Sequence, residues 1–257
     1  MGRTKVESIM NRGKIICAVS LILGCALFAL SGCSNFQYKG NEGDKTAGTL
    51  PFIDEKPWGE NQTATYTIYN KNEEYGTAEI TTIKNSDNKT YDIQKTKSIK
   101  ADDKAEEVKS GVTVNADTLM PTSSYYNKTS VSENFEISTQ YSDDWNVDTT
   151  VNNTTNQKLN LPNSYYDNES LAVILGAVSY DDKATFRIND TIPLIAGISV
   201  LDIKYKGTET ISVPYGEAEC YKVFLGKIVF WFSVDNRTLY QYQDGDIIYK
   251  LTAYKNS

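Results

Sequence analysis

The chain has 257 residues, with 33 acidic against 26 basic side chains and no histidine. The lack of histidine excludes Ser-His-Asp and Cys-His catalysis and histidine-ligated zinc. The acidic balance disfavours nucleic acid as a partner, and no spacing of a glycine-rich phosphate loop appears.

The first 33 residues have the pattern of a bacterial lipoprotein signal. Basic residues precede an apolar run over residues 15–30, which ends at Leu30-Ser31-Gly32-Cys33. The run is shorter than the roughly 20 residues of a transmembrane helix. A cysteine after Leu-Ser-Gly resembles the lipobox, whose thiol receives a diacylglycerol and becomes the mature first residue. The sequence predicts a signal peptide over residues 1–32, with Met1 or Met10 as its start, and lipidation of Cys33.

Lipidation of Cys33 predicts a protein held on the cell membrane and facing outside the cytoplasm. Two acyl chains are enough for stable anchoring. Residues 1–32 carry four basic residues and one acid, so the remaining chain has 22 basic and 32 acidic side chains. Its acidic surface disfavours anionic headgroups, so the lipid is expected to make the membrane contact. Many Lys, Asn and Tyr and few Arg indicate a Gram-positive surface.

Beyond Cys33 the sequence predicts a flexible tether and then one long β-rich domain. Residues 33–57 contain several Gly and Pro among polar residues and show little periodicity. Residues 58–257 form the predicted domain. The Asn-rich stretch over residues 147–168 has two interpretations, an internal boundary between two packed halves or an exposed hairpin.

From Thr63 onward, alternating apolar and polar residues predict an antiparallel, mainly β protein built from hairpins. The clearest later strands are Ala184 to Asn189, Ile198 to Tyr205, Glu209 to Val213, Glu217 to Leu225, Lys227 to Val234, Leu239 to Tyr242 and Ile247 to Tyr254. Gly, Pro, Asn and Asp turns separate them, Lys206-Gly207 among these. Residues 169–178 predict one short helix, capped by Ser170 and weakened by Gly176, with a buried strand as the alternative.

Three groups of polar residues have a chemical and a plain structural interpretation. Cys220 lacks a disulfide partner in the mature chain, so we expect a buried side chain, against the alternative of a reactive thiol. Asp144, Asn146 and Asp148 occupy alternate positions, so on one face of a strand they could offer oxygen atoms to Ca²⁺. The Gly and Glu that an EF-hand loop needs are missing, which favours a solvated strand or turn. We expect the doublets Asp143-Asp144 and Asp181-Asp182 to form turns, in preference to the catalytic carboxylate pair of a glycoside hydrolase. No cofactor and no metal are expected.

An aromatic cluster near the C-terminus is the candidate ligand-binding site. It comprises Phe230, Trp231, Phe232, Tyr240 and Tyr242. Alternation places Phe230 and Phe232 on one face of a strand and Trp231 on the other. One set would fill the core and the other would line a groove or platform for a lipid or a glycan. The alternative is that both faces are covered and the residues only pack.

A series of landmarks in order resembles the bacterial family of domain of unknown function 3108 (DUF3108). The landmarks are Gly59-Glu60 with Tyr66, Gly76-Thr77-Ala78, Leu119-Met120-Pro121, Leu171 to Val178, Val213-Pro214-Tyr215-Gly216, Phe230 to Asp235 and Gly245 to Leu251. The resemblance implies antiparallel hairpins coiled into an open or partial β-barrel. The sequence departs from the family pattern at two places that concern any shared ligand site. The family has an Arg after the apolar segment, where this chain has Ser179-Tyr180-Asp181, and a small residue before Gly216, where this chain has Tyr215.

These observations predict a cell-surface lipoprotein that binds and does not catalyse. The first hypothesis is a binding module for an apolar or amphipathic envelope ligand, with a lining that reaches solvent near Trp231 or residues 171–178. The second is a structural or wall-glycan interaction protein of the envelope. The third is a carboxylate-based hydrolase, which needs two acids converging from different strands. Ligand, oligomeric state and protein partners are beyond the sequence.

Overall fold

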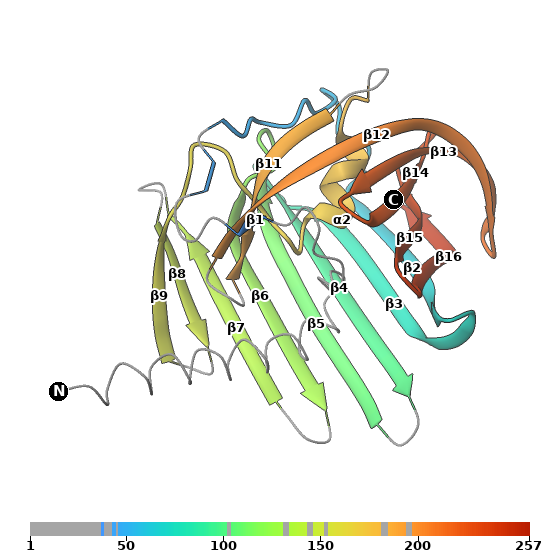
Figure 1. The fold of residues 1–257 in the computed structure, drawn as a ribbon, viewed down its shortest axis with the longest axis horizontal. Coiled ribbons are helices and arrows are strands. Elements are labelled where there is room, and N and C mark those ends of the chain that lie inside the picture. The colour runs from blue at the N-terminus through green and yellow to red at the C-terminus, as the bar shows by residue number, and fades with distance from the viewer. Residues whose placement is uncertain are drawn as a thin grey trace. The chain divides into compact units, whose positions relative to one another are not determined.

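The computed structural model describes residues 37–38, 43–44, 46–101, 104–130, 134–142, 146–151, 154–180, 185–193 and 197–257. Most of these residues form strands of one sheet (Figure 1). The strands are β1 (Gln37–Tyr38), β2 (Asn61–Asn70), β3 (Glu73–Lys84), β4 (Thr90–Ala101), β5 (Lys104–Asn115), β6 (Pro121–Ser130), β7 (Asn134–Tyr141), β8 (Asn146–Val151), β9 (Thr154–Asn160), β10 (Tyr166–Asp167), β11 (Thr185–Ile192), β12 (Gly197–Val213), β13 (Gly216–Leu225), β14 (Ile228–Ser233), β15 (Leu239–Asp244) and β16 (Ile247–Asn256).

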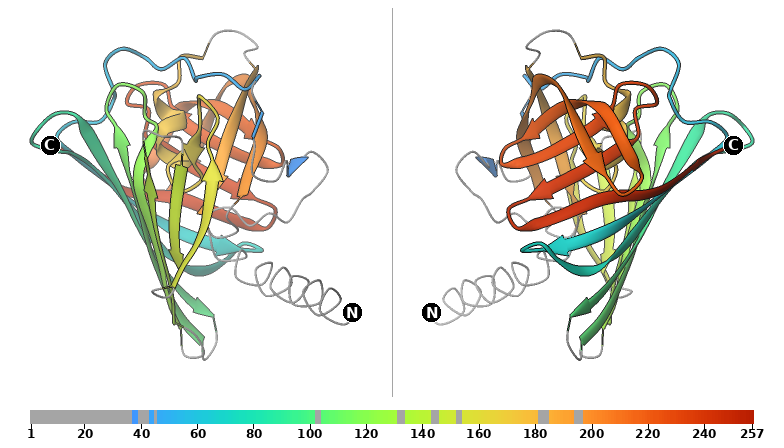
Figure 2. Two further views of the ribbon diagram at one scale, coloured as in Figure 1. Left: turned by 90° about the vertical axis from the view of Figure 1, so that its left-hand side faces the viewer. Right: turned by 90° about the vertical axis from the view of Figure 1, so that its right-hand side faces the viewer.

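The sheet is a curved meander that stays open. Its path runs from β10 through β11 to β16, then from β2 through β9, so the last strand pairs with β2. The two ends of this path are β10 and β9, and the strands coil around a common interior (Figure 2). Pairing along the path is antiparallel except between β10 and β11. The open or partial barrel of antiparallel hairpins is therefore confirmed, and β8 and β9 continue the same sheet as a hairpin.

Alternation along the strands gives the sheet one apolar inner face. On β2 the buried residues are Gln62, Ala64, Tyr66 and Ile68, and the residues between them are half-buried. The same period of two continues on the neighbouring strands. A second apolar cluster lies on the inner face of β5 to β7, formed by Val108, Tyr126 and Ile137 with Phe135 against them. The inner face therefore carries more than one apolar region.

A short helical segment fills the interior, as the sequence predicts. It comprises α2 (Leu171–Ile174) and the 3₁₀ turn η2 (Leu175–Ala177), and all its residues are buried. The predicted cap is wrong, because the Ser170 hydroxyl donates to the Asp167 carbonyl and makes no cap bond. Gly176 is required by close packing: a Cβ there would lie 2.5 Å from the Arg237 carbonyl oxygen and 3.1 Å from the Phe232 ring.

The strand β12 corrects one predicted turn. Lys206-Gly207 does not separate two strands, because β12 continues through this point as one strand of 17 residues with a shift in register between Tyr205 and Thr208. Gly207 has φ of +92°, which suits glycine in a bulge. A bulge bends and twists its strand, and β12 and β13 arch over β14 to β16 (Figure 1).

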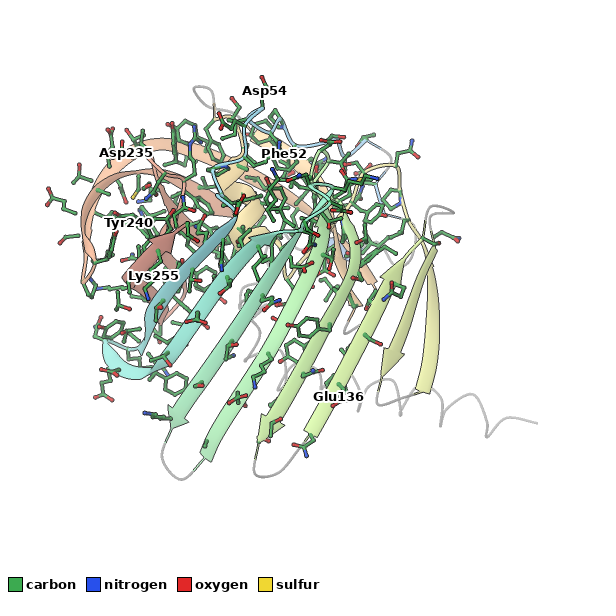
Figure 3. The ribbon with its side chains drawn as sticks, turned by 180° about the vertical axis from the view of Figure 1, so that it is seen from behind. Phe52, Asp54, Glu136, Asp235, Tyr240 and Lys255 are labelled. Atoms are coloured by element: carbon green, nitrogen blue, oxygen red, sulfur yellow. The ribbon has the colours of Figure 1, made fainter. Side chains whose placement is uncertain are left out.

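Part of the predicted tether packs on the sheet. The Gly48 amide donates to the Arg187 carbonyl, the Ile53 amide donates to the Ala177 carbonyl, and Phe52 forms a bridge with Val178. Leu50 is buried, and Phe52 lies across the end of the sheet (Figure 3). Residues 46–57 thus form a strap over the helical segment. Among the described residues, no helix has the length and apolar character to cross a membrane.

We predict that Gly176→Ala destabilises the domain by about 1–3 kcal/mol, because the added methyl group must displace either backbone or a packed ring. Chemical denaturation of residues 34–257 measures the effect. Gly48→Ala is the matched control, since a Cβ there meets nothing within 4 Å and Gly48 lacks a positive φ. Equal stability of the two variants would contradict the close packing of the helix.

Candidate ligand-binding site

Three of the five predicted aromatic residues belong to the core. Phe230 and Phe232 stack with ring centroids 5.9 Å apart, and Tyr242 meets Phe230 edge to face at 5.3 Å. All three are fully buried on the inner face, where Phe232 lies against Gly176. Their contribution is packing, and they do not line a described groove.

Trp231 and Tyr240 are placed differently, on the outer face of the sheet. The Trp231 indole N–H donates to Glu209, and the Lys222 ammonium lies 5.3 Å from the centre of its ring. Trp231 is 6% exposed, so its surface is mostly covered. Tyr240 meets the ring of Tyr215 at 5.9 Å, beneath the tip of the β12–β13 hairpin. The predicted split between two faces is therefore present in the structure.

Beside this outer-face cluster lies a groove of about 320 Å³. It is formed by the turn between β2 and β3, the outer face of β2 and β16, and the tip of the β12–β13 hairpin. Its lining residues are Tyr69, Asn72, Ser212, Val213, Pro214, Ile248 and Lys250. The volume is at the small end of the range for ligand pockets, about 300–1,000 Å³. The lining is amphipathic, with apolar and polar side chains in similar numbers.

Backbone hydrogen bonds fix the walls of the groove. The Tyr215 amide donates to the Leu251 carbonyl at 3.0 Å, which holds the hairpin tip against β16. The Lys71 amide donates to the Asp246 carbonyl at 3.1 Å, which holds the β2–β3 turn against the β15–β16 turn. The groove is consequently formed before any ligand arrives.

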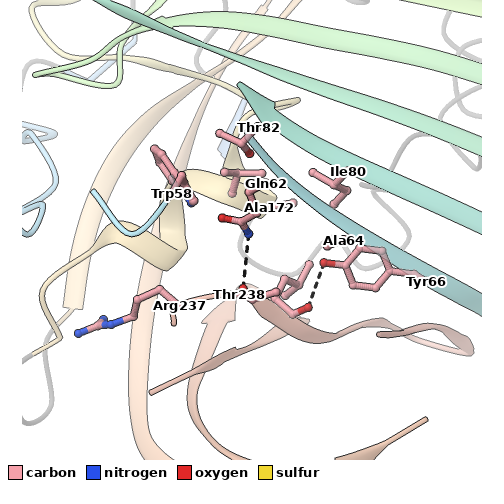
Figure 4. A pocket seen from close by; sticks show the side chains of 11 residues that line it. Trp58, Gln62, Ala64, Tyr66, Ile80, Thr82, Ala172, Arg237 and Thr238 are labelled. Carbon is pink, nitrogen blue, oxygen red and sulfur yellow. Dashed lines mark hydrogen bonds between the residues drawn. The ribbon is translucent and has the colours of Figure 1, made fainter. Parts of the chain in front are cut away.

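A second, much smaller cavity lies between the helical segment and β2 (Figure 4). Its volume of about 20 Å³ is enough for one water molecule. Gln62 donates a long hydrogen bond of 3.4 Å to the Thr238 hydroxyl, while its carbonyl oxygen is buried without a partner. A water molecule here would satisfy that oxygen. The cavity is too small for a larger ligand.

A buried charged network fastens the helical segment to the strands. Glu169 lies 2.5 Å from the Lys95 ammonium and accepts a 2.7 Å hydrogen bond from the Ser110 hydroxyl. Asp167 accepts a 2.5 Å hydrogen bond from the Tyr141 hydroxyl and a 2.8 Å bond from the Glu169 amide. These contacts join β4, β5 and β7 to the chain just before α2.

The pKa values of the buried acids Asp167, Glu169 and Asp190 are shifted in different directions. Burial raises the pKa of Asp167 to about 6, against the hydrogen bonds from Tyr141 and the Glu169 amide. Burial also raises the pKa of Glu169, but the Lys95 ammonium, the Ser110 hydroxyl and Lys97 together outweigh burial, and the net pKa is below its ordinary value. Burial and then the charges of Asp167 and Glu169 hold the pKa of Asp190 well above its ordinary value. One Asp190 oxygen has no hydrogen-bond partner.

Sequence reasoning missed this network, although it had a signal. Buried and more exposed residues alternate along β4, and the odd-numbered residues are the buried ones. Lys95 and Lys97 therefore lie on the same apolar face as Ile93 and Ile99. Asp167 and Asp190 lie on the paired strands β10 and β11, where Asp190 is opposite Tyr166 and Asp167 is opposite Thr191. These two acids come from neighbouring strands, and both are at most 3% exposed. This burial suits a fastening role better than contact with a substrate.

The remaining predicted residues have separate outcomes. Cys33 and the doublets Asp143-Asp144 and Asp181-Asp182 lie outside the described residues. Cys220 is buried, and desolvation raises the pKa of its thiol to about 12. Within the described part of the chain, no group of three acidic or cysteine side chains is arranged to hold a metal ion.

We predict that Asp190→Asn stabilises the domain at neutral pH by about 1–3 kcal/mol, because it removes a buried carboxyl whose ionisation is disfavoured. A raised folded pKa means that wild-type stability falls as pH rises above the unfolded value of about 4. The gain should therefore vanish near pH 4 and grow toward pH 8.

Denaturation curves from pH 4 to pH 8 test this prediction, with Asp235→Asn at an exposed carboxyl as the control. Parallel pH profiles for wild type and Asp190→Asn would contradict the assignment of Asp190 as a buried neutral group.

Comparison with known proteins identifies the family and the fold. No curated protein matches the sequence. Among solved structures, the fold is similar to a crystal structure titled as a beta-barrel-like protein of domain of unknown function DUF1849 from Brucella abortus. The TM-score is 0.54 at 8% identity, over 78% of this chain and 99% of that one. At this identity the similarity concerns the fold alone. The family model described as "Protein of unknown function (DUF3108)" matches residues 57–246, and the chain therefore belongs to that family.

Proposed function

We propose that this protein is a non-catalytic, lipid-anchored binding module of the cell envelope that holds an amphipathic ligand. The observation that carries the proposal is the groove between the β12–β13 hairpin and strands β2 and β16. It is the kind of concave, mostly pre-formed site with a few polar groups that small ligands use.

The lining supports an amphipathic ligand in preference to a wholly apolar one. Val213, Pro214 and Ile248 offer apolar surface, and the Tyr69 ring adds a flat aromatic face. Asn72 and Ser212 add hydrogen-bonding groups, and both are exposed at the rim of the groove. Such a lining would take the junction between the polar and apolar parts of a molecule.

Lipidation of Cys33 provides the envelope location in this proposal. A diacylglycerol would hold the domain at the membrane surface, where amphipathic molecules are concentrated. The wall-glycan alternative has support of its own in Tyr125 and Tyr215, which are 39% and 42% exposed and so present aromatic surface. The groove is the more specific feature, because three chain segments build it.

We predict that residues 34–257, purified from the native host, carry an additional small mass in native mass spectrometry that is lost on denaturation. This fragment contains the whole described sheet and forms a compact unit by itself. Tyr69→Ala should lower the fraction of protein with the added mass at least fivefold, because the aromatic face of the groove is removed.

Tyr125→Ala is the matched control, since it removes an exposed tyrosine on β6 and leaves the groove unchanged. Repeated empty spectra of the wild type would count against the binding module and favour a surface interaction with wall glycan. Equal loss in both variants would place the ligand elsewhere.

A further inference from the structure

The groove contains a basic side chain whose environment points to a class of ligand. Among the described residues that line the groove, Lys250 is the one charged side chain. It lies on β16 with its ammonium 5.5 Å from the centre of the Tyr69 ring. This is within the range of a cation–π contact, which orients the ammonium without neutralising it.

Some lysines of the domain have carboxylate partners. Lys95 pairs with Glu169 at 2.5 Å, and Lys222 pairs with Glu209 at 3.1 Å. Within the described part of the chain, the groove brings no carboxylate to Lys250. The other polar groups of the lining are the Asn72 amide and the hydroxyls of Ser212 and Tyr69. These groups donate hydrogen bonds, as does the ammonium.

We propose that the groove selects an anionic single-chain amphiphile, with its acidic headgroup at Lys250 and its chain against Val213, Pro214 and Ile248. This inference rests on the proposed function and adds the charge of the ligand. The volume of about 320 Å³ is small for a lipid with two chains, and it would hold the headgroup and the adjoining part of one acyl chain.

The net acidity of the protein does not conflict with local selection of an anion. Charges separated by more than about 8–10 Å are largely screened at physiological ionic strength, whereas a contact within the groove is screened less. The acidic surface would reject an anionic bilayer as a whole.

The experiment is calorimetric titration of residues 34–257 with two probes of equal chain length, below their micelle concentrations. The headgroup of lysophosphatidylglycerol has a net negative charge, and the zwitterionic headgroup of lysophosphatidylcholine has no net charge. The wild type should bind the anionic probe about fivefold to tenfold more tightly, as a single charge-assisted contact provides. Lys250→Gln should bring this ratio close to one, and added salt should lower it.

Lys255→Gln is the control, because Lys255 is an exposed lysine of the same strand outside the groove lining (Figure 3). It should retain the wild-type ratio. If both probes bind equally and Lys250→Gln changes nothing, the charge selection is overturned while the binding function stands. If neither probe binds, the proposed function and this inference both fail.

A third arm separates an amphiphile from a simple anion. Inorganic phosphate at millimolar concentration should compete weakly, because it lacks the chain that contacts Val213 and Ile248. Complete displacement of lysophosphatidylglycerol by phosphate would show that the site recognises the anion only, and would overturn the assignment of an amphiphile.

Discussion

The buried contact between Glu169 and Lys95 is the constraint on which this architecture depends. An open sheet cannot cover its own apolar inner face, so another part of the chain must enter the interior. The segment Leu171–Ala177 does so, and the ion pair at its start fixes it to β4. Removing one partner of such a pair would leave a buried charge without compensation. The pair therefore sets the position of the helix within the sheet.

The position of the helix in turn determines which surfaces remain for function. Phe230, Phe232 and Tyr242 are occupied by core packing around Gly176. On the outer face, the bulge at Gly207 bends the β12–β13 hairpin over β16. One positive-φ glycine thus has a consequence far along the strand, because it brings Ser212 and Val213 to the groove.

Much of the fold could be predicted from the sequence, because the signals are local. Period-two alternation identified the later strands, and a short run of apolar residues identified the helix at 169–178. The bulge at Gly207 was interpreted as a turn, since both features use a glycine with positive φ. The Ser170 cap failed because the Asp167 side chain bonds the Glu169 amide and the Ser170 hydroxyl turns to a carbonyl.

The candidate site was only half predictable. Alternation correctly separated Trp231 from Phe230 and Phe232. It could not show that Glu209 of β12 and Lys222 of β13 would contact the Trp231 ring, which is only 6% exposed. The groove joins Tyr69 with residues 212–214 and 248–250, which are distant in sequence and meet only after β16 pairs with β2. The acids Asp167 and Asp190 likewise come to lie on neighbouring strands through one parallel pairing. Long-range pairing leaves no spacing to recognise in a single sequence.

The most direct test of the account is to locate a bound amphiphile by nuclear magnetic resonance. A stearate with a nitroxide near its carboxylate broadens amide signals close to its binding site in residues 34–257. The account predicts that the amide signals of Tyr69, Ser212 and Ile248 broaden, while those of Val108 and Ile137 on the inner face of β5 to β7 do not. Broadening confined to the inner-face residues would contradict it and would place the ligand inside the curved sheet.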